Sequence, residues 1–182
     1  MATLNILPNA DVMNSPAWTI GTGSDVYAVL DDDDTGHVTS DASDIEATAT
    51  GKQCIVNMED HGLAGGTTIN SVQGVVKHNN RGRGTNYDIE MKILHSGGTY
   101  YTESTTVQNG ASSWITTTFT ARTTSDGSTA WSLGEIDGLR MGLRLAAISG
   151  GTVGITYAYF IIDYTAGAVA AADNATFFGA NF

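Results

Sequence analysis

The chain of 182 residues has a single cysteine, few prolines and few charged side chains. Its single thiol, Cys54, can form neither an intramolecular disulfide nor a cysteine-based zinc site. No apolar run approaches the roughly 20 residues needed to cross a bilayer. The first residues, Met1 to Leu4, have neither the basic start nor the apolar core of a signal peptide. We therefore expect a protein that is made in the cytoplasm and binds no membrane.

Lysine and arginine are missing from the first 51 residues, which carry nine acidic side chains. The whole chain has a formal net charge of −11. Phosphate backbones would repel a chain this acidic, so we expect no nucleic-acid partner. Solubility explains the acidic front, and so would a basic protein partner or a bound cation.

Glycine and threonine are abundant, and polar and apolar side chains alternate over residues 71–77, 87–93 and 140–145. Alternation with a period of two is typical of a strand with one wet face. Turn signals at 79–84, 96–98, 108–110 and 149–151 predict hairpins between such strands. Residues 153–164 are apolar on both faces, which predicts a central strand, and only 132–137 suggests a helical turn. The pattern predicts an all-β fold: a jelly-roll-like antiparallel β-sandwich over residues 16–164.

The two ends differ from this body. Residues 1–15 contain apolar side chains without clear alternation, and residues 165–182 are rich in alanine and glycine. We expect extended N-terminal and C-terminal arms. The second ends on Phe177, Phe178 and Phe182, which could dock in a neighbour's groove, each buried ring contributing roughly 1.5–3 kcal/mol. Packing on their own domain is an equally good interpretation.

Two acidic segments are candidates for chemistry. Asp31 to Asp34 precede Gly36, as in a calcium loop, which makes Asp31 and Asp33 weak metal candidates. The helical calcium-loop template fails, because its twelfth position is Ala42, so we expect a solvated loop and no metal. His61 stands beside Glu59 and Asp60, and we expect a loop histidine there rather than a catalytic or metal-binding one.

Motifs for catalysis are missing from the sequence. It has no Gly-x-Ser-x-Gly elbow and no glycine fingerprint for phosphates or dinucleotides, so we expect a protein that is not an enzyme and needs no cofactor. Arg81 and Arg83 flank Gly82 in a predicted turn. Their guanidinium groups could clamp carboxylates of a partner, or the turn is merely exposed. Strand aromatics could form a sugar-stacking platform, but we expect them in the core: Tyr100, Tyr101, Trp114, Tyr157 and Tyr159.

The segment 126–143, Asp-Gly-Ser-Thr-Ala-Trp-Ser-Leu-Gly-Glu-Ile-Asp-Gly-Leu-Arg-Met-Gly-Leu, is followed by an apolar strand over 159–164. Together they resemble β-sandwich virion structural proteins of tailed bacteriophages, of the head decoration or cement type. The resemblance implies that Trp131 plugs one end of the sandwich and that Ile136 and Leu139 seal the crossover between the sheets.

The same resemblance implies a location and partners. It points to a virion structural protein on the phage head surface, which binds the major capsid protein and itself, for example as a trimer at a symmetry axis. The alternative is a carbohydrate- or receptor-binding domain of a phage fibre or tail protein. Fold alone does not choose between them.

Overall fold

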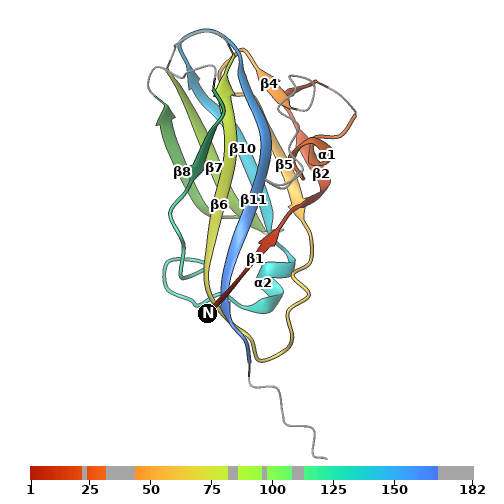
Figure 1. The fold of residues 1–182 in the computed structure, drawn as a ribbon, viewed down its shortest axis with the longest axis vertical. Helices are drawn as coiled ribbons and strands as arrows, with labels where there is room; N and C mark the ends of the chain where they lie inside the picture. The colour runs from red at the N-terminus through yellow and green to blue at the C-terminus, as the bar shows by residue number, and fades with distance from the viewer. Residues whose placement is uncertain (22–23, 32–43, 82–85, 96–97, 108–112, 168–182) are drawn as a thin grey trace, which may run out of the picture.

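The computed structural model describes residues 1–21, 24–31, 44–81, 86–95, 98–107 and 113–167, and it contains two antiparallel β-sheets packed face to face (Figure 1). The first sheet has the order β3-β4-β11-β6-β9, and β1 pairs with a second stretch of β11. Its strands are β1 (Ala2–Ile6), β3 (Thr19–Ile20), β4 (Ile45–Ala47), β6 (Thr68–Asn80), β9 (Ile115–Thr118) and β11 (Val153–Thr165). The second sheet has the order β2-β5-β10-β7-β8. Its strands are β2 (Pro8–Asn14), β5 (Gln53–Met58), β7 (Tyr87–His95), β8 (Gly98–Val107) and β10 (Arg140–Ile148).

From β4 onward, the chain changes sheets at every connection except the one between β7 and β8. The resulting orders, β4-β11-β6-β9 and β5-β10-β7-β8, are those of a jelly roll, in which Greek-key connections join two facing sheets. The predicted all-β, jelly-roll-like antiparallel sandwich is therefore confirmed.

Most of the predicted hairpins are wrong. Only β7 and β8 pair with each other directly, as expected. The segments 71–77 and 87–93 lie in opposite sheets, and so do the strands on either side of 108–110 and of 149–151. Turn residues reverse the chain direction, but the next strand can then pair beside the last one or cross to the facing sheet. Both arrangements bury the same apolar face.

Residues 1–15 were expected to form an arm, and this prediction is wrong for β1 and β2. β1 pairs with β11 from Ala2↔Tyr164 to Ile6↔Phe160, and β2 pairs with β5 at the edge of the other sheet. Ile6 is completely buried. Short edge strands bury only a few side chains each, so they need no sustained alternation in the sequence. Of the expected C-terminal arm, residues 168–182 lie outside the described residues.

One hydrophobic core fills the space between the sheets. Tyr87, Ile89, Met91 and Ile93 are all buried, and the residues between them face outward, which confirms the alternation along β7. β11 is buried on both faces over 153–158, as predicted for a central strand. Cys54 is buried in this core, where burial, with a smaller effect of Asp11, raises the pKa of its thiol.

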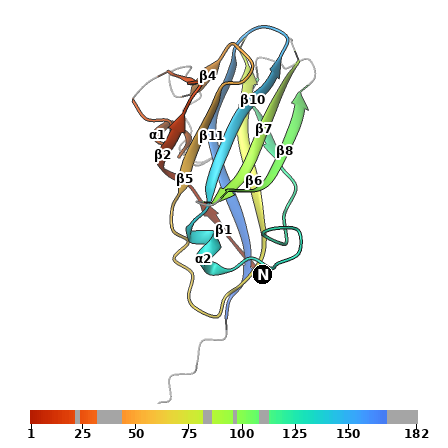
Figure 2. The same ribbon diagram turned by 180° about the vertical axis from the view of Figure 1, so that it is seen from behind.

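The short helix α2 (Leu133–Asp137) closes one end of the sandwich (Figure 2). Ser132 and Glu135 form a capping box, in which the Ser132 N–H donates to Glu135 Oε2 at 2.7 Å. Trp131 is buried, and its indole N–H donates to the Arg122 carbonyl oxygen at 2.8 Å. Ile136 and Leu139 are also buried.

The sequence did not predict the other helix, α1 (Tyr27–Leu30), which places Val29 and Leu30 in the core. The carboxylate of Asp11, on β2, accepts the N–H groups of Val26 and Tyr27 and so holds the start of α1. Within the described ranges, neither helix is long enough to cross a bilayer.

Candidate functional site

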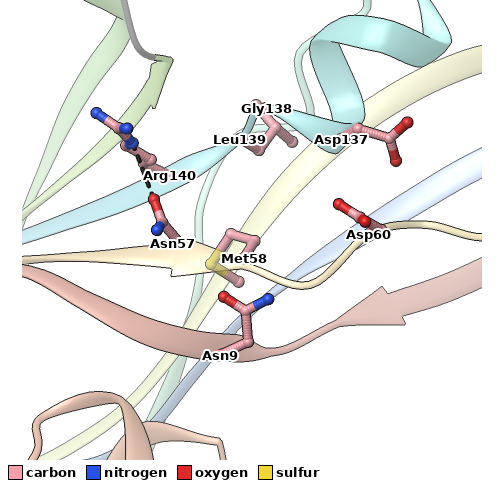
Figure 3. Close-up of a pocket in the computed structure, with 8 residues that line it drawn as sticks. All are labelled: Asn9, Asn57, Met58, Asp60, Asp137, Gly138, Leu139 and Arg140. Atoms are coloured by element: carbon pink, nitrogen blue, oxygen red, sulfur yellow. Dashed lines mark hydrogen bonds between the residues drawn. The ribbon is translucent and has the colours of Figure 1, made fainter.

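A polar pocket of about 270 Å³ lies beside the end of α2, and we call it the α2-end pocket (Figure 3). Four separate segments build it: β2, the end of β5 with the residues after it, the end of α2, and the start of β10. Its polar lining residues are Asn9, Asn57, Asp60, Asp137 and Arg140, and its other lining residues are Met58, Gly138 and Leu139.

Local geometry explains why these segments meet. The capping box starts α2 at Leu133, and the helix ends five residues later with Gly138 as its C-cap, which leaves Asp137 at the pocket. The chain then enters β10, where the Met58 N–H donates to the Leu139 carbonyl oxygen at 3.1 Å. This bond ties the end of β5 to the start of β10 and fixes that side of the pocket.

Hydrogen bonds hold two of the polar groups in place. Arg140 Nε donates to Asn57 Oδ1 at 2.9 Å. A guanidinium can only donate, so the Asn57 carboxamide must turn its oxygen to Arg140 and keep its own N–H groups for other partners. Asp60 is exposed, and its side chain and that of Asn9 point toward the space beside Met58 (Figure 3).

His61 contacts Asp137, one of the residues that line the pocket. Asp137 Oδ1 accepts the His61 backbone N–H at 3.2 Å. The same oxygen lies 3.3 Å from His61 Nε2 but forms no hydrogen bond with it. The Leu63 N–H donates to His61 Nδ1, so the ring proton sits on Nε2, toward Asp137. The His61 side chain is only 6% exposed, against 46% for Asp137. This arrangement orients Asp137 through the His61 backbone, and it buries Nε2 without a hydrogen-bond partner among the described residues.

A second surface gathers positive charge on the outward face of the five-stranded sheet. We call it the basic face, and it comprises Ile55, Lys92, Leu94, Arg140, Gly142 and Arg144. Leu94 leans over Gly142, where a side chain would collide with it, and a small hollow of about 60 Å³ remains beside them. Lys92 and Arg144 share one carboxylate, that of Glu90, at 3.2 and 3.7 Å.

Arg81, predicted to clamp a partner's carboxylates, is occupied inside the chain. It bonds the buried carboxylate of Asp44 at 2.7 Å and also pairs with Glu46, and its side chain is only 22% exposed. The two acids come from β4 and the residue before it, and β4 lies beside β11, which in turn pairs with the end of β6. Arg81 is therefore part of the structural framework and not an open partner-binding group.

The remaining predicted site residues fall mostly outside the described part of the chain. Arg83, Asp33 and the three tail phenylalanines, Phe177, Phe178 and Phe182, belong to ranges that are not described. Asp31 directly follows α1, and its backbone N–H donates to the Tyr27 carbonyl oxygen. Among the described residues, no three His, Cys, Asp or Glu side chains gather as they would around a metal ion.

Comparisons with known proteins assign no family to the chain, and the structural neighbours described here are distant. No family model and no curated protein matches the chain. Among solved structures, it is similar to the arabinose-bound α-L-arabinofuranosidase MgGH51, with a TM-score of 0.43, 9% identity and 68% of this chain covered. That likeness spans only 20% of the enzyme. It is also similar to a CBM4 carbohydrate-binding module, with a TM-score of 0.34, 13% identity, and 65% of this chain and 78% of that chain covered. Likenesses this distant assign neither an activity nor a ligand.

Proposed function

We propose that this protein is a non-catalytic virion structural protein, which docks on a phage head shell through the basic face and stabilises the shell. The virion assignment rests on the resemblance of residues 126–143. The docking proposal rests on one observation: three of the eight basic side chains, Lys92, Arg140 and Arg144, lie on one outward sheet face of a chain with a net charge of −11.

Charge decides which surface can approach an acidic partner. Most of the chain would repel a carboxylate-rich shell, whereas on this sheet face three cations, Lys92, Arg140 and Arg144, outnumber the two outward carboxylates of β7, those of Asp88 and Glu90. Lys92 and Arg144 are 31% and 40% exposed, so their pairs with Glu90 are of the weak surface kind and can exchange for carboxylates of a partner. Ile55 and Leu94 add apolar contact area between the charges.

The five-stranded sheet makes this face rigid, which suits a cementing function. Each copy would bind the major capsid protein across a boundary between shell subunits, so disassembly must break this added contact as well. Self-association, for example as a trimer at a symmetry axis, would multiply the effect without any new kind of contact.

The test is binding of the purified full chain to head shells that lack it, measured as copies bound per shell. We expect Lys92→Glu with Arg144→Glu to weaken binding at least about tenfold, and added salt to weaken wild-type binding. Lys77→Glu, on β6 in the opposite sheet, is the control, because it makes the same change as Lys92→Glu away from the basic face. If the double variant binds as wild type does, the basic face is not the docking surface.

The C-terminal arm, residues 165–182, is the alternative docking element. A chain ending after Gly167 lacks Phe177, Phe178 and Phe182 but keeps every described residue. Lost shell binding in that variant, with normal binding by the Lys92 and Arg144 variant, would assign docking to the tail instead.

A second candidate function is a carbohydrate- or receptor-binding domain of a fibre or tail protein. The α2-end pocket is the observation that favours it. A glycan array probed with the purified protein separates the two functions, since shell docking needs no glycan.

A further inference from the structure

We propose that the α2-end pocket binds a neutral, hydroxylated ligand, a single sugar ring of a glycan. This inference rests on the second candidate function and names its ligand class. It does not depend on shell docking, although Arg140 belongs both to the pocket lining and to the basic face.

The size of the pocket limits the ligand to one ring. Its volume of about 270 Å³ is below the roughly 300–1,000 Å³ typical of pockets for drug-sized ligands. A longer glycan would therefore place one ring in the pocket and leave the rest in solvent.

The lining offers both acceptors and donors of hydrogen bonds. Asp60 and Asp137 present carboxylate oxygens, and the Asn57 carboxamide, with its oxygen held by Arg140, presents N–H groups. Asn9 can do either. A hydroxyl group donates one hydrogen bond and accepts others, so neighbouring hydroxyls on a ring match such a lining. Met58 and Leu139 supply apolar surface for the C–H groups of the ring.

The charges of the lining disfavour other ligand classes. Two carboxylates repel an anion, and the guanidinium of Arg140 opposes a metal ion or the ammonium group of a lysine. The formal charges of the lining sum to −1, with the Asp60 and Asp137 carboxylates on one side and the Arg140 guanidinium beside Asn57 on the other (Figure 3). So small a net charge suits a neutral ligand.

Asp137 is held ready for binding rather than for proton transfer. The backbone N–H of His61 bonds its Oδ1, and the His61 ring packs against the same oxygen. The other oxygen of Asp137 can accept a ligand hydroxyl without first giving up a partner inside the described part of the chain. A preorganised acceptor loses little entropy when the ligand binds.

The test is an NMR titration of the full ¹⁵N-labelled chain with the methyl glycosides of glucose, galactose, mannose and N-acetylglucosamine. We expect at least one to bind saturably with a Kd in the millimolar range. The largest shifts should fall on the amides of Asp60, Gly138 and Arg140. Asp60→Asn should weaken binding about tenfold, since a charged acceptor becomes a neutral one.

The matched control is Asp88→Asn, which removes the same charge from an outward position on β7 and should leave the affinity unchanged. Asn9→Ala provides a second pocket variant, which touches none of the bonds that hold His61. The proposal is wrong if no glycoside saturates, if the shifts lie elsewhere, or if Asp60→Asn binds as wild type does. Saturation of the same amides by methylammonium instead would make the pocket a cation site. Shell binding by these variants reports separately on the docking function.

Discussion

Acidification should destabilise this protein through one buried histidine, His78. Its ring connects three strands: Nδ1 is 2.7 Å from the Tyr87 hydroxyl on β7, and Nε2 is 2.8 Å from Thr117 Oγ1 on β9. Both partners are neutral, and the residue is completely buried. Burial lowers the pKa of His78 from 6.5 to about 4, because an imidazolium would lose its hydration here without gaining a counter-charge.

The direction and size of the effect follow from proton linkage. The unfolded chain keeps a histidine pKa near 6.5, so between pH 6.5 and pH 4 the unfolded state binds more protons than the folded state. The free energy of unfolding therefore falls as the pH falls through this window. The full loss, reached below pH 4, is about 3 kcal/mol, at 1.36 kcal/mol per pKa unit. Between pH 7 and pH 5 we expect a loss of about 2 kcal/mol from this group.

The assay compares urea unfolding of the wild type and of His78→Gln at pH 7 and at pH 5, followed by tryptophan fluorescence. Glutamine can hydrogen-bond to Tyr87 or to Thr117 but does not titrate. Other titrating groups are common to both proteins and cancel in the comparison. The wild type should lose about 2 kcal/mol more than the variant between the two pH values.

Equal losses in the two proteins would refute this reasoning. An NMR titration of the His78 ring in the native wild type gives an independent test, which still applies if the variant fails to fold. A ring that titrates near pH 6.5 would show that the buried network does not hold His78 neutral.

Three further predictions concern single sites. Gly154→Ala should cost about 2–3 kcal/mol in urea unfolding, because its methyl group would collide with the buried Asp44 carboxylate. The control Gly134→Ala, which meets open space, should be neutral or slightly stabilising, and equal costs would contradict the argument. Ser132→Ala should cost about 1 kcal/mol by removing the N-cap of α2, and an unchanged urea midpoint would show that the capping box adds nothing. Cys54 should react with Ellman's reagent at pH 8 only after unfolding, since burial raises its pKa, and prompt labelling of native protein would contradict this.

Much of the fold could be predicted from local patterns in the sequence. Alternation along β7 was readable because one wet face imposes a period of two on any strand. The helical turn at α2 was predicted from residues 132–137, where Ser132 and Glu135 supply the cap within four residues of each other. The buried positions of Trp131 and Cys54 were predicted as well.

Arg81 shows where local pattern failed. In the sequence it stands beside glycines in a turn, and nothing nearby indicates a partner. Asp44, 37 positions earlier in the chain, reaches it only because β4 and β6 both pair with β11. The α2-end pocket was not predicted for the same reason, since Asn9, Asp60 and Asp137 belong to segments far apart along the chain. The one available signal was the acidic group around His61, whose neighbour Asp60 lines the pocket.

The sequence by itself determined the fold class, the strand faces, the short cap at α2 and the inert thiol, because neighbouring residues set periodicity, turns and caps. Tertiary structure decided which sheet each strand joins, that β1 and β2 belong to the sandwich, and which charges find partners. Those outcomes depend on pairings between distant segments, which compete in free energy and leave no local mark on the sequence.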